Sequence, residues 1–275
     1  MKERERPLRV VVLSSTHFGL RCINDGVLAT PEARLVGILT TPRVIPISYA
    51  PNGLTINTHT DFRETAASTG CEVAELTHSP RIADYLQHLE PWRADLILVL
   101  GWYYNVPRTV RETASQGCLG IHASLLPRYR GGAPLVWAIM NGEQETGVSL
   151  FHLTDEIDAG DIVGQRAFKI EDADTIATVL KKSESSAVSL LAEKLPLLVR
   201  GQAECRCQDH TQATVFPQRS PGDGLIDWSW SRKKLYDFIR AQTHPYPGAY
   251  FYQGNEKTYL WDASTAMALY APQSA

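Results

Sequence analysis

The sequence predicts an α/β protein with a Rossmann-like, mostly parallel sheet and helices on both of its faces. Short apolar runs, such as residues 8–15 and 95–101, have the near-continuous hydrophobic character of strands buried on both sides. They alternate with segments of helical length, and this alternation is typical of a doubly wound parallel sheet. With 44% hydrophobic and 21% charged residues, the 275-residue chain holds enough apolar material for a sizeable core.

The elements of the first part of the chain follow from these runs and from the residues that begin the helices. Ser15 and Thr16 offer an N-cap to the first helix, Asp61 caps the second, and Pro107 opens the fourth. Residues 43–60 show no clear period and are expected to form a long surface loop. Strands are predicted at residues 8–15, 35–41, 73–76, 95–101 and 118–122, and helices at about 16–29, 61–68, 80–89 and 107–115.

The second part of the chain is expected to end in a smaller appendage. Polar residues, glycine and proline mark residues 201–224 as a linker, and Gln253-Gly254-Asn255-Glu256 lies between two short apolar runs as a hairpin signal. Helices are predicted at residues 134–141, 175–200 and 231–242, and strands at 147–153, 162–170, 250–252 and 258–262. The expected division is a main domain over residues 1–203, a linker over 204–230 and a short, truncated carboxyl-terminal helix and β-hairpin over 231–275.

Composition and motifs argue against several classes of protein. A net charge of −3 gives no electrostatic footprint for nucleic acid, and no apolar stretch approaches the roughly 20 residues that span a bilayer. The charged amino terminus does not resemble a signal peptide, and five scattered cysteines favour reduced thiols, so we expect a cytoplasmic protein without a membrane partner. Cys205-Arg206-Cys207 with His210 fits no standard zinc spacing, so no metal is expected. The first strand is not followed by the glycine pattern of dinucleotide-binding proteins.

One histidine stands where parallel sheets bind their ligands. The predicted strand at residues 118–122 is apolar up to His122, and a loop containing proline and glycine follows it. Asp158 lies beyond one helix and one strand, and loops at the carboxyl edges of adjacent parallel strands face one crevice, so the two side chains are expected to meet. A carboxylate beside an imidazole fixes its tautomer and yields a proton acceptor and donor suited to neutral pH. The alternative is a core histidine and a turn-capping aspartate, since structural pairs of this kind are common.

Residues 117–165, GCLGIHASLLPRYRGGAPLVWAIMNGEQETGVSLFHLTDEIDAGDIVGQ, closely resemble the formyltetrahydrofolate-dependent formyltransferases. That family includes methionyl-tRNA formyltransferases, sugar-nucleotide N-formyltransferases and formyltetrahydrofolate hydrolases, and weaker likeness extends over residues 8–263. The resemblance implies that residues 1–203 form a formyltransferase catalytic domain in which His122 is the catalytic histidine and Asp158 orients it. An amine would attack the formyl carbon of 10-formyltetrahydrofolate directly, without a metal. The folate-binding residues that it implies are Trp102, Tyr103, Tyr104, Asn105, Val106, Ser124, Leu125, Leu126, Pro127, Thr154, Asp155, Glu156 and Ile157.

The chain departs from the family pattern at one position of the site. The usual Asn-x-His places an asparagine that helps to hold the formyl oxygen, and here that position is Gly120. Loss of one oxyanion donor typically costs about a hundred- to a thousandfold in rate. His122 as imidazolium, aided by a backbone N–H or water, could replace the donor. Asn105 or Tyr104 could reach in, or activity could be lost. We favour compensation, because hydrolase-type relatives also lack this asparagine.

The resemblance also bears on the acceptor. The loop at residues 42–60 has one arginine and no lysine, and little chain follows residues 245–249, so the basic loop and full carboxyl-terminal domain of tRNA-modifying relatives are not expected. We therefore expect a small-molecule amine, either a nucleotide amino sugar or an amino-acid-derived amine such as hydroxyornithine, no tRNA partner, and a monomer or homodimer. A methionyl-tRNA formyltransferase-like enzyme, a hydrolase and a non-catalytic folate-binding relative are the alternatives. His17, Phe18, Tyr49 and Asn57 are expected on the acceptor side.

Overall fold

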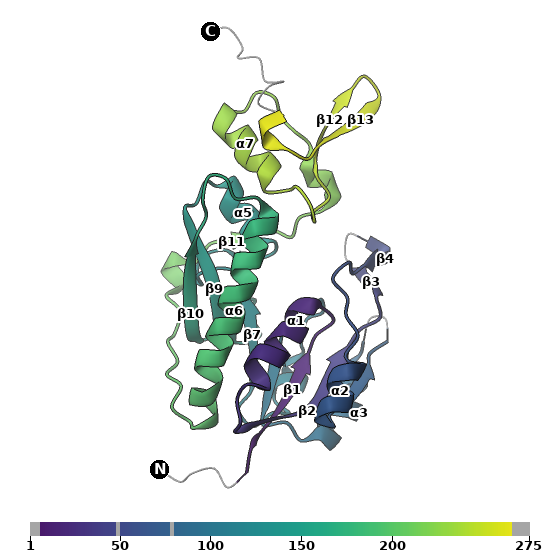
Figure 1. The fold of residues 1–275 in the computed structure, drawn as a ribbon, viewed down its shortest axis with the longest axis vertical. Coiled ribbons are helices and arrows are strands. Elements are labelled where there is room, and N and C mark those ends of the chain that lie inside the picture. Colours follow the sequence, from purple (N-terminus) through teal and green to yellow (C-terminus); the bar gives the residue numbers. More distant parts are fainter. Residues whose placement is uncertain (1–5, 48–49, 78–79, 266–275) are drawn as a thin grey trace. The chain divides into compact units, whose positions relative to one another are not determined.

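The principal sheet of the protein has seven strands in the order β10-β9-β7-β6-β1-β2-β5. A computed structural model describes residues 6–47, 50–77 and 80–265 (Figure 1). Strand β1 pairs in parallel with β2 and β6, β2 with β5, and β6 with β7, whereas β7 and β9 are antiparallel. The prediction of a mostly parallel α/β sheet is therefore confirmed. The strands are β1 (Leu8–Leu13), β2 (Ala33–Thr40), β5 (Glu72–Glu75), β6 (Leu96–Val99), β7 (Cys118–His122), β9 (Glu145–His152) and β10 (Ile162–Lys169).

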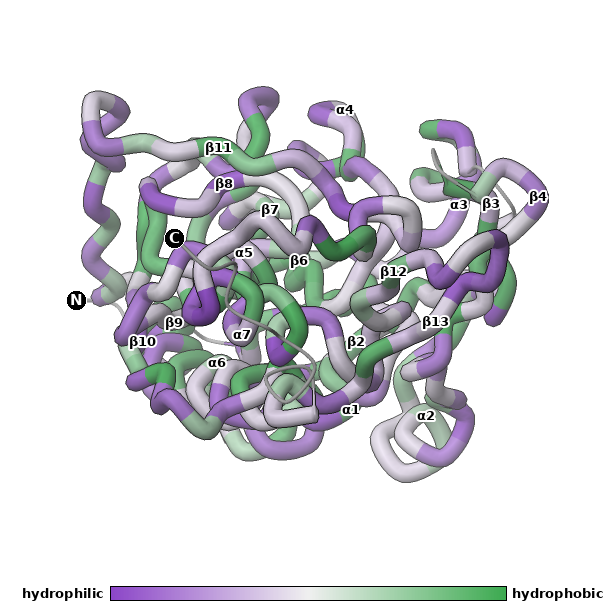
Figure 2. Tube along the Cα trace, turned by 90° about the horizontal axis from the view of Figure 1, so that it is seen from above, coloured by the Kyte–Doolittle hydropathy of each residue, from purple (hydrophilic) through white to green (hydrophobic). Residues whose placement is uncertain are grey.

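Hydrophobic runs form the central strands because both of their faces are buried. Val10, Val12 and Leu98 are fully buried, and in Figure 2 the hydrophilic colour lies mainly on the outer turns, with hydrophobic segments between them. Thr16 caps the first helix as predicted, since its side chain accepts a hydrogen bond from the Gly19 N–H. The helices are α1 (His17–Cys22), continued by a π-helical turn η1 (Ile23–Val27), α2 (Arg63–Thr69), α3 (Ile82–Trp92), α4 (Arg108–Arg111), α5 (Pro134–Met140), α6 (Ile176–Val199) and α7 (Arg232–Arg240).

Two predicted segments differ from the structure. Residues 43–60 are not simply a loop, because they contain an antiparallel hairpin of β3 (Val44–Ile47) and β4 (Ala50–Thr55). Its single buried side chain in β3, Ile45, is too weak a signal for a period-2 pattern. Helix α4 is also much shorter than the predicted residues 107–115, since the chain turns at Thr113, whose N–H bonds to the carbonyl of Val110.

The chain divides into two compact units. The first consists of residues up to His122 together with Ser149–Gln165 and Ala187–Gln208, and the second holds the remainder. In the first unit, helix α3 packs on the sheet through Tyr85, Leu89 and Trp92, which contact the buried side chains of β1, β2 and β6. The predicted site residues follow the carboxyl ends of β6 and β7, at one edge of this sheet.

The second unit has two hydrophobic clusters of its own. One gathers Tyr129, α5, the start of α6 and Ala241, and the other surrounds α7 and the carboxyl-terminal hairpin. The predicted hairpin is present, with Ala249 opposite Leu260. Its remaining elements are β8 (Arg130–Gly131), β11 (Val215–Phe216), the 3-10 turns η2 (His210–Gln212) and η3 (Pro221–Gly224), and the hairpin strands β12 (Ala249–Gln253) and β13 (Glu256–Leu260).

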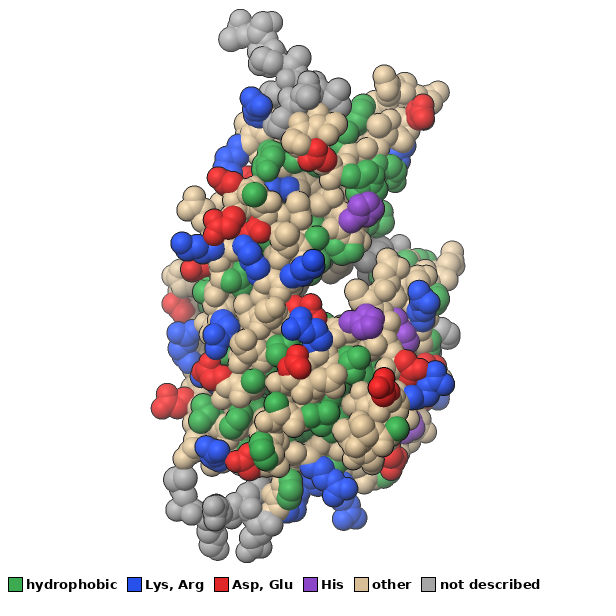
Figure 3. All heavy atoms as spheres, viewed as in Figure 1, with side chains coloured by type: hydrophobic (Ala, Val, Ile, Leu, Met, Phe, Trp, Pro, Cys, Tyr) green, Lys and Arg blue, Asp and Glu red, His purple; other side chains and the backbone are tan. Residues whose placement is uncertain are grey.

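The surface carries both signs of charge. On the face drawn in Figure 3, basic and acidic side chains are interspersed over most of the area, in keeping with the net charge of −3. Within the residues that the structure describes, no helix is both long and apolar enough to cross a membrane.

Candidate functional site

His122 and Asp158 meet, as the sequence predicts. His122 is the last residue of β7, and its Nδ1 lies 3.5 Å from Oδ2 of Asp158. The two side chains are only 11% and 16% exposed, so water screens their interaction weakly. A carboxylate beside Nδ1 favours a proton on that nitrogen and leaves Nε2 as the acceptor. The pair can therefore take up a proton at Nε2 and hold the resulting charge.

The route by which Asp158 reaches His122 differs from the predicted one. Strand β9 is antiparallel to β7, with His122 opposite Ser149 and Leu119 opposite His152, so β9 ends at the opposite end of β7 from the imidazole. The loop after β9 must return along β7, and it begins with the N–H of Leu153 bonded to the carbonyl of Cys118 at 2.8 Å. The expectation of adjacent carboxyl edges was therefore wrong for β7 and β9, although the two side chains do meet.

The returning loop adopts a backbone that few sequences would tolerate. Asp158 has a left-handed backbone with φ of 53°. Gly160 approaches the chain so closely that a Cβ there would lie 1.9 Å from the carbonyl oxygen of His152. The Asp-Ala-Gly-Asp motif thus supplies one residue type that accepts positive φ and one with no side chain.

A half-buried arginine and a buried glutamine hold the loop at its ends, and the sequence reasoning missed both. At the start, Arg111 donates to the carbonyls of Leu153 at 2.8 Å and Val106 at 3.1 Å, and it pairs with the carboxylate of Asp155. At the end, Gln208 donates to the carbonyl of Asp158. Gln208 falls in the predicted linker, and neither residue belongs to a recognisable motif, so no sequence signal identified them.

The place of the family asparagine is filled by a neighbouring side chain. Gly120 and His122 are two residues apart on β7, so they face the same side of the sheet. A Cβ at Gly120 would lie 2.9 Å from Cδ2 of Leu153 and 3.5 Å from the Phe151 ring, and that ring lies edge-on to His122 with centroids 6.5 Å apart. The wall beside His122 is therefore apolar.

The segment after β6 forms an aromatic turn. Gly101 has φ of 67°, and a Cβ there would lie 2.1 Å from Oγ1 of Thr16, so the position requires glycine. The Trp102 ring is edge-on to those of Tyr104 and Tyr85, and burial raises the pKa of Tyr85 to about 12. Of the predicted folate-binding residues in this segment, Val106 is buried, Trp102 and Tyr104 are half-buried, and Tyr103 and Asn105 are exposed.

The other predicted folate-binding residues lie in two places. Thr154, Asp155, Glu156 and Ile157 are exposed on the loop after β9, where Ile157 is 71% exposed and Thr154 Oγ1 donates to the carbonyl of Glu156. Ser124, Leu125, Leu126 and Pro127 belong to the second unit. There Ser124 is fully buried and donates to the carbonyl of Arg128 at 2.7 Å, and Leu126 is 2% exposed.

The predicted acceptor-side residues lie near the start of α1 and in the loop after β4. His17 is exposed, Phe18 is half-buried and Asn57 is exposed, whereas Tyr49 is outside the described residues. No group of three or more histidine, cysteine or acidic residues in the described part of the chain is arranged to hold a metal. A depression of about 730 Å³ lies away from His122, between β10, the end of α6 and residues 202–206.

Comparison with known proteins adds to this geometry. Residues 60–195 match the family described as formyl transferase, and residues 219–273 match its carboxyl-terminal domain. A sugar N-formyltransferase from Shewanella is 18% identical, with 92% of this chain and 96% of that chain covered and a TM-score of 0.71. An N-formyltransferase from Helicobacter canadensis, in complex with folinic acid and dTDP-3-aminofucose, is 15% identical, with coverage of 85% and 80% and a TM-score of 0.65.

A third neighbour is HypX from Aquifex aeolicus in complex with tetrahydrofolic acid. It is 20% identical, with 93% of this chain covered and a TM-score of 0.65. The chain spans only 37% of the length of that HypX. At these identities the three structures show the shared fold.

Proposed function

The chain belongs to the formyl transferase family, and from this membership we propose that it transfers the formyl group of 10-formyltetrahydrofolate directly to the amine of a small molecule. The observation that most strongly supports transfer chemistry is the half-buried His122–Asp158 pair at the end of β7. It supplies one acceptor nitrogen, fixed by one carboxylate, at the edge of the sheet where α/β proteins bind their substrates.

In the proposed reaction His122 moves protons while the two substrates react with each other. The amine nitrogen forms a bond to the formyl carbon and gives a tetrahedral oxyanion, while Nε2 of His122 accepts a proton from that amine. The bond between the formyl carbon and N10 of the folate then breaks, and a proton passes to N10 as tetrahydrofolate leaves. Asp158 holds the imidazole in one tautomer and stabilises its charged form between these steps.

The oxyanion is held without a side chain at position 120. Leu153 and Phe151 line that side of the site, and neither offers a hydrogen bond. We assign the role to protonated His122, whose positive charge is present when the oxyanion forms. In an apolar surrounding that interaction is stronger than in water, which compensates for the lost donor.

The folate is assigned to the walls formed by residues 102–106 and 154–157. The aromatic rings of the first segment offer flat surfaces and the exposed Ile157 of the second offers an apolar side chain, and a pterin ring can contact both. The assignment of Ser124–Pro127 to the folate stays a prediction. The complexes of HypX with tetrahydrofolic acid and of the Helicobacter enzyme with folinic acid support a folate as co-substrate.

For the acceptor we propose an amino sugar on a nucleotide. The Shewanella neighbour is a sugar N-formyltransferase, and the Helicobacter neighbour was solved with dTDP-3-aminofucose. The scarcity of basic residues in the loop at 42–60 supports a small acceptor over tRNA. An amino-acid-derived amine remains the second candidate because it presents the same nucleophile. The monomer or homodimer and the domain boundaries after residues 203 and 230 stay predictions.

A folate-release assay tests the proposal. Nucleotide amino sugars and ornithine derivatives are screened for amine-dependent conversion of 10-formyltetrahydrofolate to tetrahydrofolate. His122→Ala and Asp158→Asn should each lower kcat by at least about a hundredfold, whereas the matched change Asp25→Asn, at an exposed residue paired only loosely with Arg21, should not. Formate release without any amine would indicate a hydrolase instead, and folate binding without turnover would indicate a non-catalytic relative.

A further inference from the structure

Gln208 is a buried amide that bonds the chain on both sides of Ala159. Gln208 is only 6% exposed. Its Nε2 donates to the carbonyl of Asp158 at 2.9 Å and to the carbonyl of Gly160 at 2.7 Å. An amide nitrogen has two N–H donors, so each carbonyl receives one. No other side-chain type of similar size offers two donors and no net charge in this position.

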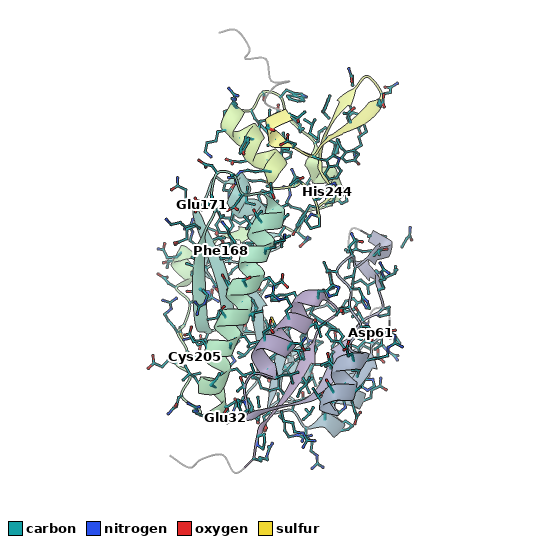
Figure 4. All side chains as sticks on the ribbon, viewed as in Figure 1. Glu32, Asp61, Phe168, Glu171, Cys205 and His244 are labelled. Atoms are coloured by element: carbon teal, nitrogen blue, oxygen red, sulfur yellow. The ribbon has the colours of Figure 1, made fainter. Side chains whose placement is uncertain are left out.

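Gln208 is itself held in place by the edge of the sheet. Arg206, two residues earlier, forms a β-bridge with Ile162, with N–O distances of 2.8 and 2.9 Å. The Arg206 guanidinium also donates to Oε1 of Gln165 at 2.7 Å. Figure 4 labels Cys205 at the start of this short segment, which follows α6. The amide of Gln208 therefore extends from a fixed backbone.

The loop that ends at Gly160 needs such a support. Asp158 sits in the left-handed region, which is unfavourable for a residue other than glycine. Strand β9 ends away from His122, so sheet pairing does not place Asp158 beside the imidazole. One hydrogen bond of Gln208 holds the carbonyl of the residue whose carboxylate must reach Nδ1 of His122, and the other holds the carbonyl of Gly160, two residues later.

We propose that Gln208 is a positioning residue for the His122–Asp158 pair, because it fixes the backbone from which the Asp158 carboxylate reaches the imidazole. Gln208 does not touch the reacting atoms and acts only through Asp158. Its effect on the rate rests on the proposed function, whereas its effect on the imidazole does not.

The test replaces Gln208 without changing the size of the side chain. Gln208→Met keeps the volume and removes both donors, and Gln87→Met makes the same change at an exposed, hydrogen-bonded glutamine of α3 in the same unit. The first readout is the pair of ring ¹⁵N shifts of His122 in ¹⁵N-histidine-labelled protein, identified by their loss in His122→Ala. These shifts report the tautomer in the free protein, with no substrate present.

In the wild type and in Gln87→Met, we expect one tautomer with the proton on Nδ1. In Gln208→Met, the ring shifts should move toward a mixture of tautomers while the protein stays folded by circular dichroism. The second readout is kinetic: kcat should fall about ten- to a hundredfold with the KM for the folate little changed. Gln208→Asn keeps an amide on a shorter side chain, so its ring shifts and kcat should lie between those of the wild type and of Gln208→Met. It serves as the test variant if Gln208→Met does not fold.

Wild-type ring shifts in folded Gln208→Met or Gln208→Asn would overturn the proposal. So would a change in KM alone, because that would indicate a role in binding rather than in positioning. If no amine acceptor supports turnover by the wild type, the proposed function fails while the ring shifts still decide the role of Gln208.

Discussion

Because Gly120 has no side chain, Leu153 and Phe151 form the wall beside His122. The sequence identified the departure from Asn-x-His but not what fills the space, because Leu153 reaches Gly120 only through the antiparallel return of the chain after β9. His122 and Asp158 could be found from the sequence because each stands in a recognisable motif. Arg111 and Gln208 could not be found from the sequence, because they bond to backbone carbonyls, and every residue type has a backbone carbonyl.

The Gly120–Leu153 contact predicts that the family asparagine cannot simply be restored. Gly120→Asn should lower the free energy of unfolding by about 1–3 kcal/mol, because the amide beyond the new Cβ overfills the space already packed by Leu153 and Phe151. Adding Leu153→Ala should recover part of that loss and open room for the amide. Urea denaturation measures the first effect, and the folate-release rate of the double variant against Leu153→Ala alone measures the second. If Gly120→Asn alone is as stable as the wild type, the space is not limiting.

His152, at the end of β9, should make the free energy of unfolding depend on pH. Burial lowers the pKa of His152 below its usual 6.5, although nearby Asp161 acts in the opposite direction. Between the folded value and 6.5 the unfolded chain binds more protons, so stability is lost as the pH falls through that range. Urea denaturation from pH 8 to pH 5.5 should show this slope in the wild type. His152→Gln should flatten it, whereas His17→Gln, at an exposed residue, should leave it unchanged.

At the scale of elements, the apolar runs predicted the central strands well because burial on both faces leaves a continuous hydrophobic signal. Strand direction left no such signal. The strand at residues 147–153 reads the same in either direction, so its antiparallel pairing with β7 came only from the structure. The β3–β4 hairpin was missed for a related reason, since a hairpin with only one buried residue has little hydrophobic pattern.

Arg111, the last residue of α4, connects the two segments to which the folate is assigned, residues 102–106 and 154–157. Arg111 bonds the carbonyls of Val106 and Leu153 and is 11% exposed, so Arg111→Met should cost about 1–3 kcal/mol of stability and raise the KM for the folate. Arg63→Met is the matched control: Arg63 is 87% exposed and pairs with Asp61, so its loss should lower stability much less than Arg111→Met does. Equal effects of the two variants would contradict the assignment.

At the scale of the whole molecule, the second unit depends on a buried ion pair between segments far apart in sequence. Arg240 bonds Asp237, both with side chains under 5% exposed, and also donates to the carbonyls of Glu171 and Asp174. Figure 4 labels Glu171 at the end of β10, so α7 is tied to the segment that precedes α6. Hydrophobic clusters could be anticipated from composition, but this pairing could not, because Asp237 and Arg240 look like an ordinary charged face of a helix.

Removing one member of this pair should be far more damaging than removing both. Arg240→Met should lower the free energy of unfolding by about 3–5 kcal/mol, because it leaves the Asp237 carboxylate buried with only Lys233 as a charged partner. The double change Asp237→Leu with Arg240→Met should recover much of that loss. Arg232→Met, exposed on the same helix, is the control in the denaturation series. A loss below about 1 kcal/mol for Arg240→Met would refute this view of the pair.

The antiparallel return after β9 has a consequence for how this protein can diversify. The distance that Asp158 must travel back along β7 is set by the number of residues after Leu153, so one insertion or deletion there would carry the carboxylate past the imidazole or stop it short. The exposed positions 155–157 can be substituted, but the number of residues in this segment must stay constant to place Asp158 beside His122. New specificities are therefore expected to arise here by substitution and elsewhere by insertion.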